Sequence, residues 1–150
     1  MTRTLRLILL PLGLALLVAA GCGSSSGDSS SGDGASGQGD GRGVRLVSVQ
    51  EGVDLQNSAP DGLIILDVRT PEEFAEGHLE GARMIDFYLD DFADRIAELD
   101  PDVPYLVYCR SGNRSGQTVA IMEELGFSDV ADVDGGIMSW LDAGLPTVTQ

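Results

Sequence analysis

Lysine is missing from this 150-residue sequence, so its basic side chains are all arginines, nine of them against 24 aspartates and glutamates. The formal net charge at pH 7 is therefore -15. A chain this acidic is repelled by phosphate backbones, because few cations offset its negative charge. We therefore expect no nucleic-acid partner, and we interpret most of the carboxylates as solvated surface.

Side chains that bind metals are also scarce. The sequence has two cysteines, Cys22 and Cys109, and one histidine, His78. A zinc site needs about four protein or water ligands, and no cluster here has the required spacing. No glycine-rich nucleotide loop follows a predicted strand either. We therefore expect neither a metal nor another cofactor, and the two cysteines lie in segments so different that each needs its own explanation.

The first 21 residues have the features of an export signal. Arg3 and Arg6 precede an apolar run over residues 7–20, and small residues lead up to Cys22. The run is shorter than the ~20 apolar residues that span a bilayer, which favours a secretion signal over an anchor helix. The ending Ala19-Ala20-Gly21-Cys22 resembles the lipobox of bacterial lipoproteins, whose cysteine becomes the lipidated first residue. Cleavage after an alanine without lipidation is the simpler alternative.

Residues 22–43 form a Gly/Ser-rich segment with almost no apolar side chains. Such a segment cannot repay the entropy of ordering, so we interpret it as a flexible tether with a reach of roughly 25 Å. The lipobox resemblance implies several acyl chains on Cys22, and stable anchoring needs more than one. We therefore expect an exported chain, held by lipid on the outer face of the cytoplasmic membrane or another cell-envelope membrane, with one folded domain over residues 44–150.

Short apolar runs alternate with helix-like stretches through residues 44–150. The run Leu63-Ile64-Ile65-Leu66 has no polar alternation, which is typical of a central strand covered on both faces. The pattern predicts an α/β fold with a mainly parallel central sheet and helices on both of its faces. The predicted strands cover residues 45–49, 63–66, 82–85, 105–108 and 130–133, and the predicted helices cover 50–57, a short segment from 71, 88–99, 115–125 and a turn around 137–141.

The short helix from Pro71 has sequence signals at both ends. Thr70 can cap its first turn, Pro71 suits the first helical position, and Glu73 completes a capping box. Gly77 follows closely and is expected to end the helix.

The segment around Cys109 lies where a predicted strand gives way to a predicted helix, which is where ligands gather in α/β sheets. A cysteine attacks as a thiolate, and its ordinary pKa of about 8.5 leaves only a minor fraction ionised at neutral pH. Loop amides, the start of the helix, Arg110 and Arg114 would all favour negative charge on the sulfur and on an incoming anion. We therefore predict that Cys109 is a nucleophile. The loop reads Cys109, Arg110, Ser111, Gly112, Asn113, Arg114 and Ser115.

This loop resembles the active-site loop of the rhodanese family of sulfurtransferases. Other marks of that family occur before and after the loop in the expected order, so the resemblance covers about residues 44–145. It implies the rhodanese-like form of the α/β fold. These marks are Leu66-Asp67-Val68-Arg69, Glu73-Phe74, Gly77-His78-Leu79-Glu80-Gly81-Ala82, and Asp134-Gly135-Gly136 followed by Trp140.

The resemblance implies a two-step transfer of sulfane sulfur. Cys109 takes the outer sulfur of a small anionic donor such as thiosulfate and becomes a persulfide, and a thiol or cyanide then removes that sulfur. The amides of residues 110–115 would cradle the persulfide, while the side chains of Arg110 and Arg114 would favour anionic donors. Because residues 44–150 contain no second cysteine, the acceptor must be external, and a protein acceptor stays open.

Two other functions remain open at this point. The chain could be a sulfur carrier or interaction module that passes its persulfide to one protein and turns over free donors poorly. A cysteine phosphatase or arsenate reductase is the other alternative. Related phosphatases have a loop one residue longer than the four residues between Cys109 and Arg114, which makes sulfur the better substrate here.

Four further residues attract attention. Asp67 and Arg69 follow a central strand, where they could support the active loop, although we favour an internal ion pair between them. In the family pattern His78 is structural rather than a general base. We expect Trp140 to pack the last helix against the sheet.

Overall fold

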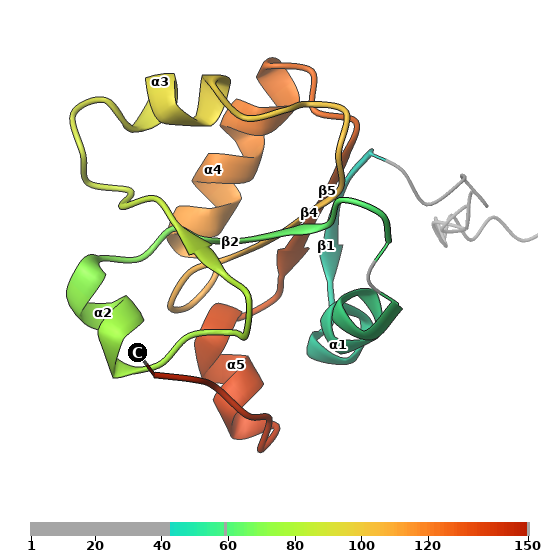
Figure 1. Ribbon diagram of the computed structural model, residues 1–150, viewed down its shortest axis with the longest axis vertical. Helices are drawn as coiled ribbons and strands as arrows, with labels where there is room; N and C mark the ends of the chain where they lie inside the picture. The colour runs from blue at the N-terminus through green and yellow to red at the C-terminus, as the bar shows by residue number, and fades with distance from the viewer. Residues whose placement is uncertain (1–42, 59, 150) are drawn as a thin grey trace, which may run out of the picture. The chain divides into compact units, whose positions relative to one another are not determined.

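The computed structural model describes residues 43–58 and 60–149. The expected signal peptide, the lipidation residue Cys22 and the tether, apart from Gly43, lie outside these residues. Figure 1 shows strands and helices that alternate along the described chain. The strands are β1 (Gly43–Val47), β2 (Ile64–Asp67), β3 (Arg83–Met84), β4 (Tyr105–Tyr108) and β5 (Asp129–Val133), and the helices are α1 (Val49–Ser58), α2 (Pro71–Glu76), α3 (Phe92–Ala97), α4 (Asn113–Glu124) and α5 (Gly136–Asp142).

The strands form one sheet of five parallel strands in the order β1-β5-β4-β2-β3. Strand β4 lies in the middle, and each of its four residues is buried. At its carboxyl end, Tyr108 is paired with Asp67 of β2, and the Val68 amide donates to the Tyr108 carbonyl at 3.1 Å. The ends of β2 and β4 therefore lie side by side, and the residues that follow them are close in space.

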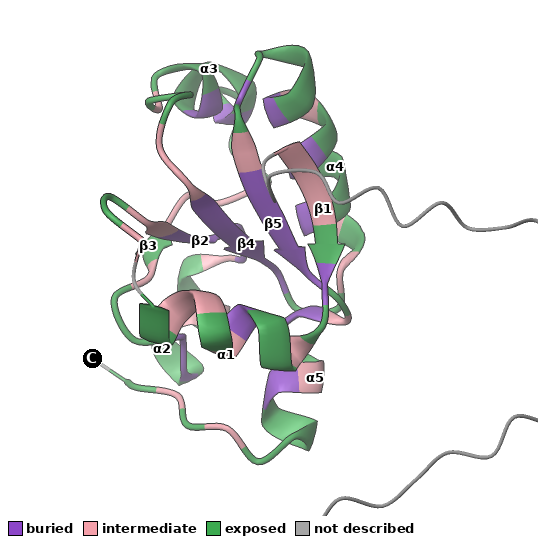
Figure 2. Ribbon diagram, turned by 90° about the vertical axis from the view of Figure 1, so that its right-hand side faces the viewer, coloured by how far each residue is buried: buried purple, intermediate pink, exposed green. Residues whose placement is uncertain are grey.

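Helices cover both faces of the sheet, as Figures 1 and 2 show. Phe92 and Ile96 of α3 pack with Met122 of α4 on one face. Ile137 and Trp140 of α5 pack on the other face, which α1 also covers. The predicted α/β fold, with a parallel sheet between helices, is confirmed, as is the packing role of Trp140.

Helix α2 begins and ends where the sequence predicted. The Glu73 amide donates to the Thr70 hydroxyl at 3.4 Å, and the Thr70 amide donates to the Glu73 carboxylate at 3.1 Å. At the other end of the helix, the Gly77 amide donates to the Phe74 carbonyl. The capping box is thereby confirmed, and it fixes Glu73 at the start of a helix beside the ends of β2 and β4.

The prediction of a helix over residues 88–99 is wrong in its extent, because α3 covers only Phe92–Ala97. Asp86 forms a turn instead. Its carboxylate accepts from the Tyr88 amide at 3.0 Å, and its carbonyl accepts from the Leu89 amide at 3.2 Å. Aspartate competes in this way with helix hydrogen bonds, so the apolar spacing alone overstated the helix.

Helix α4 begins at Asn113, two residues before the predicted start. Gly112 precedes it with a φ of 91°, a left-handed conformation that favours glycine. Arg114 and Ser115 therefore belong to the first turn of the helix rather than to the loop. Strand β1 likewise begins two residues early, at Gly43, which had been assigned to the tether.

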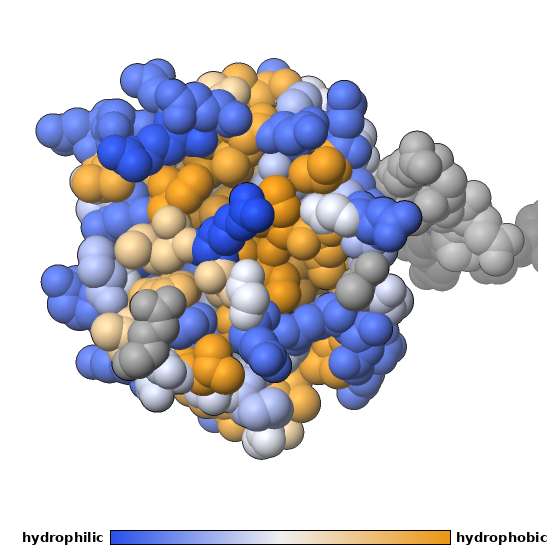
Figure 3. Space-filling model, in the orientation of Figure 1, coloured by the Kyte–Doolittle hydropathy of each residue, from blue (hydrophilic) through white to orange (hydrophobic). Residues whose placement is uncertain are grey.

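Hydrophilic side chains make up most of the surface that Figure 3 shows, and hydrophobic ones gather near its middle. Among the exposed large hydrophobic residues, Met138 and Leu141 both lie on α5. Over residues 43–58 and 60–149, no helix is both long enough and apolar enough to cross a membrane.

Truncating a core residue of the central strand should destabilise the fold far more than truncating an exposed one. Leu106 is fully buried on β4, so Leu106→Ala should lower the free energy of unfolding by about 2–5 kcal/mol. Leu46 on β1 is 66% exposed, and Leu46→Ala should change the free energy of unfolding by less than about 0.5 kcal/mol. Urea unfolding of both variants measures this, and similar losses would contradict the placement of the core.

Candidate active site

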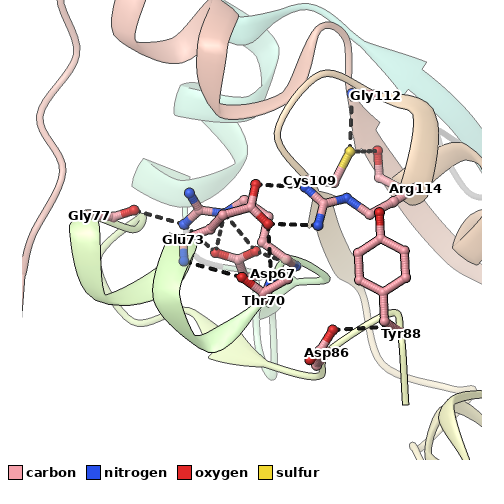
Figure 4. Close-up of polar contacts among 11 residues, drawn as sticks. Asp67, Thr70, Glu73, Gly77, Asp86, Tyr88, Cys109, Gly112 and Arg114 are labelled. Atoms are coloured by element: carbon pink, nitrogen blue, oxygen red, sulfur yellow. Dashed lines mark hydrogen bonds and ion pairs between the residues drawn. The ribbon is translucent and has the colours of Figure 1, made fainter. Parts of the chain in front are cut away.

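Cys109 follows β4 directly, at the carboxyl end of the central strand. Its sulfur accepts a hydrogen bond from the Gly112 amide at 3.1 Å and another from the Ser115 hydroxyl at 3.5 Å, as Figure 4 shows. The residue is only 1% exposed. A reactant must therefore enter the loop to reach the sulfur, which favours small or narrow donors.

The loop favours the thiolate form of Cys109. Burial alone would raise the pKa of the thiol, but the Ser115 hydroxyl and the amides of Ser115, Ser111 and Gly112 act against burial. Their combined hydrogen bonds hold the pKa below its ordinary value. Three amides of the predicted cradle, those of Ser111, Gly112 and Ser115, act on the sulfur, and that of Ser115 comes from the first turn of α4.

The start of α5 supports the loop from the other face of the sheet. The Ile137 amide donates to the Cys109 carbonyl at 2.9 Å, and the Met138 amide donates to the Arg110 carbonyl at 3.1 Å. Gly136 permits this approach, because a Cβ there would overlap the Cys109 carbonyl oxygen. The sequence offered Gly135-Gly136 only as a family mark, and the close backbone contact explains why glycine is needed.

Arg114 is held by Glu73 rather than free above the loop. Its two terminal nitrogens each donate to one carboxylate oxygen at 2.7 Å, and its guanidinium lies over the Tyr88 ring, 5.6 Å from the centroid (Figure 4). The hydrogen bonds from Arg114 lower the pKa of Glu73 to about 2, against the effect of burial. The sequence analysis gave Glu73 as a capping residue and part of a family mark. In the structure Glu73 also joins α2 to the active-site helix α4.

Arg110 is exposed, and its guanidinium pairs with no carboxylate among the described residues. It lines a cavity of about 320 Å³ beside the loop, together with part of α5. Cys109 itself does not line this cavity. The other lining residues are Arg69, Glu73, Glu76, Gly77, Ile137, Met138, Leu141 and Thr147.

Asp67 and Arg69 form a buried ion pair, which is the arrangement that we favoured from the sequence. Nη2 of Arg69 donates to the Asp67 carboxylate at 2.6 Å and to the Gly77 carbonyl at 2.7 Å. The guanidinium also lies over the Tyr108 ring, 5.5 Å from the centroid. The pair thereby ties the ends of β2 and β4 to the end of α2, next to the loop.

His78 is structural in its contacts. Its ring stacks on Phe74 with centroids 3.7 Å apart, and its Nδ1 lies 2.9 Å from the Phe74 carbonyl oxygen. Its backbone pairs with that of Val148. Asn113 also faces away from the sulfur, since it is exposed and its side chain accepts from Gln117 at 3.1 Å.

Asp132 is a buried acidic residue that the sequence analysis missed. It lies in β5, is 5% exposed, and its Oδ1 has no hydrogen-bond partner among the described residues. Burial raises the pKa of its carboxyl to about 6, while a hydrogen bond from Ser115 acts in the opposite direction. Its only signal in the sequence was a charged residue inside the otherwise apolar run 130–133.

No group of three or more histidine, cysteine or carboxylate side chains is arranged to hold a metal ion in the described part of the chain.

Comparisons with known proteins agree with this arrangement. The model of the rhodanese-like domain family matches residues 49–143. Over 80 residues the chain is 44% identical to the thiosulfate sulfurtransferase GlpE of Pseudomonas putida. This alignment covers 53% of the present chain and 71% of the relative. The chain is 35% identical over 88 residues to a sulfurtransferase of Allochromatium vinosum, covering 59% of this chain and 80% of that one.

A solved structure of a rhodanese-related protein from Thermoplasma volcanium has the same fold, with a TM-score of 0.60 and 31% identity. The alignment covers 71% of this chain and 99% of that one. The family match includes both the Cys109 loop and the Gly135-Gly136 turn that supports it. The chain thus belongs to the rhodanese-like domain family and is a rhodanese-type sulfurtransferase.

Proposed function

We propose that the chain moves sulfane sulfur from thiosulfate or a similar small anion to an external thiol or to cyanide, with a persulfide on Cys109 as the intermediate. The observation that carries this proposal is the set of hydrogen bonds on the Cys109 sulfur, which lower the pKa of a buried thiol. The thiolate is the form that attacks. The names of the relatives, thiosulfate sulfurtransferase and sulfurtransferase, support the same reaction.

In the first step the Cys109 thiolate attacks the outer sulfur of thiosulfate. A bond forms between the two sulfurs, the original sulfur–sulfur bond of thiosulfate breaks, and sulfite leaves with the electron pair. The enzyme then carries a persulfide, whose terminal sulfur is again an anion. The amides of Ser111, Gly112 and Ser115, which already face the Cys109 sulfur, are the groups that would stabilise it.

In the second step an acceptor thiolate or cyanide attacks the terminal sulfur and releases the Cys109 thiolate. Cys109 is the one cysteine between residues 44 and 150, so the acceptor comes from outside the domain. The cavity beside the loop offers a place for it, because Arg110 supplies a positive charge and Met138 and Leu141 supply apolar surface. A small thiol with some apolar surface matches this lining, in which the charge of Arg110 is opposed by that of Glu76.

A carrier function is the second candidate. The exposed side chains of Met138 and Leu141 next to the loop favour it, since exposed apolar residues near a reactive group suit a protein acceptor. Rapid turnover of thiosulfate with cyanide or small thiols would favour the enzyme, whereas transfer to one protein alone would favour the carrier. Release of phosphate from aryl phosphates would favour the phosphatase alternative.

We further propose that the chain is exported and anchored by lipid at Cys22, with residues 22–43 as a flexible tether. The charged start, the apolar run and the small residues before Cys22 support this proposal. A lipid anchor would hold the sulfurtransferase at the membrane surface and leave its active site in water.

Treatment with thiosulfate should add one sulfur atom to the protein, because the Cys109 thiolate can attack the donor and no internal thiol in the domain removes the product. Intact-mass spectrometry measures the added sulfur. Cys109→Ser should abolish it, whereas Ser139→Ala, a change outside the loop, should retain it. An unchanged mass of the wild-type protein, folded and in the reduced form, would refute the proposed intermediate.

Loss of the unpaired arginine should weaken donor binding. Arg110→Gln should raise KM for thiosulfate about tenfold with a smaller change in kcat, since a charge-assisted hydrogen bond contributes roughly 1.5 kcal/mol. Arg83→Gln is the matched control, because Arg83 is exposed on β3 and carries the same charge. Steady-state kinetics with thiosulfate and cyanide measure KM for each variant. Equal KM values for thiosulfate in Arg110→Gln and Arg83→Gln would exclude a role for Arg110 in donor binding.

Replacing the proposed lipidation residue should release the protein from the membrane. In a bacterial host that processes lipoproteins, Cys22→Ser should move the chain from the membrane fraction to the soluble fraction or leave its signal uncleaved, and the mature mass should lack acyl chains. Cys109→Ser, which leaves the other cysteine in place, should stay with the membrane. Identical fractionation and masses of wild type and Cys22→Ser would contradict a lipid anchor.

A further inference from the structure

We propose that Asp132 is a positioning residue that shares one proton with Cys109 through the Ser115 hydroxyl, and so sets the pH range over which Cys109 is a thiolate. The inference deepens the proposed function and rests on Cys109 as its nucleophile. It arises from a buried carboxylate that neither the fold nor the transfer reaction has so far explained.

Successive side chains of β5 lie on opposite faces of the sheet, and this places Asp132 on the face that the active-site helix α4 covers. Val130 packs in the core on the α4 face of the sheet, and Ala131 and Val133 pack on the opposite face. Asp132 therefore lies on the α4 side. A Cβ on Gly116 of α4 would be 3.8 Å from its Oδ2, so the carboxyl sits against the first turn of that helix.

Ser115 is next to both acidic groups. Its hydroxyl donates to the Cys109 sulfur at 3.5 Å, and it directly precedes Gly116, against which the Asp132 carboxyl lies. Hydrogen bonding from Ser115 also lowers the pKa of that carboxyl, against the larger effect of burial. Ser115 is itself fully buried, so water does not reach it readily. A hydroxyl has a single proton, and it cannot donate to the sulfur and to the carboxylate at the same time.

This limit couples the two groups. When Ser115 donates to a Cys109 thiolate, a protonated Asp132 can donate to the Ser115 oxygen, and every proton then has an acceptor. When Cys109 is a thiol, Ser115 can donate to an ionised Asp132 instead. One form converts to the other as the sulfur–hydrogen bond breaks, the sulfur proton passes to the Ser115 oxygen, and the Ser115 proton passes to the carboxylate.

The surroundings of Asp132 favour such sharing. Its partners in the sheet are apolar, Leu46 on β1 and Val107 on β4. The charged groups that face it are Asp134, which follows β5 and disfavours ionisation, and Cys109 beyond Ser115. Arg114 on α4 is engaged by Glu73. No ion pair within residues 43–58 and 60–149 involves Asp132. A carboxylate and a thiolate on either side of Ser115 would repel each other, so one shared proton is the stable arrangement.

The test is the pH dependence of Cys109 alkylation by iodoacetamide, followed by intact mass in the absence of any sulfur donor. In the wild type, two coupled groups should give a rate that rises in two steps. Asp132→Asn keeps a polar side chain that cannot be ionised and therefore cannot share a proton with Cys109. Its alkylation rate should rise in a single step, about one pH unit below the upper step of the wild type. Asp134→Asn, which removes an exposed negative charge nearby, should retain two steps.

Equal profiles for the wild type and Asp132→Asn would overturn the proposal, because a merely structural role would change stability and leave the profile unaltered. If the variant does not fold, ¹³C NMR of aspartate-labelled wild-type protein gives a second measurement. The Asp132 carboxyl should titrate in two steps with free Cys109 and in one step after alkylation, and identical titrations would overturn the proposal. Neither measurement uses thiosulfate, so failure of the proposed sulfur transfer would be seen separately.

Discussion

The site depends on hydrogen bonds that stabilise negative charge on one buried sulfur. Burial on its own would raise the pKa of the Cys109 thiol, and hydrogen bonds from donors that include Gly112 and Ser115 outweigh this effect and lower the pKa. These donors face the sulfur only because the chain turns sharply after β4 through the left-handed Gly112. The turn is held in place by amides from α5 on the carbonyls of Cys109 and Arg110. The end of the central strand and the starts of two helices are therefore needed for one reactive atom.

The arginines near the loop divide into two kinds. Arg69 and Arg114 are engaged by Asp67 and Glu73, so their charges hold neighbouring segments together and are largely compensated. Arg110 is exposed and carries the charge that an anionic donor can meet. The net charge of the chain is -15, and among the described residues near Cys109 the unpaired cation is Arg110, which would attract an anionic donor to the loop.

The sequence predicted most of what depends on neighbouring residues, the Asp86 turn excepted, and missed what depends on distant ones. The capping box at Thr70, the buried run of β4 and the cysteine at its end are local patterns, and each was found. The Asp86 turn was missed because apolar spacing suggested a longer helix. The pairing of Glu73 with Arg114 joins residues 41 positions apart, and it engages an arginine that the resemblance assigned to the donor. No local pattern could have revealed it.

Asp132 shows why a buried charge need not be a defect of the core. A carboxylate whose Oδ1 lacks a partner is costly to keep ionised in the interior, and an apolar side chain would fit the run 130–133 more simply. A proton on Asp132 removes this cost, and in the proposed coupling that proton comes from the Cys109 thiol through Ser115. As that thiol ionises, the carboxyl becomes neutral, so the pair holds one negative charge before and after. The interior therefore does not have to accommodate an additional charge when the nucleophile forms.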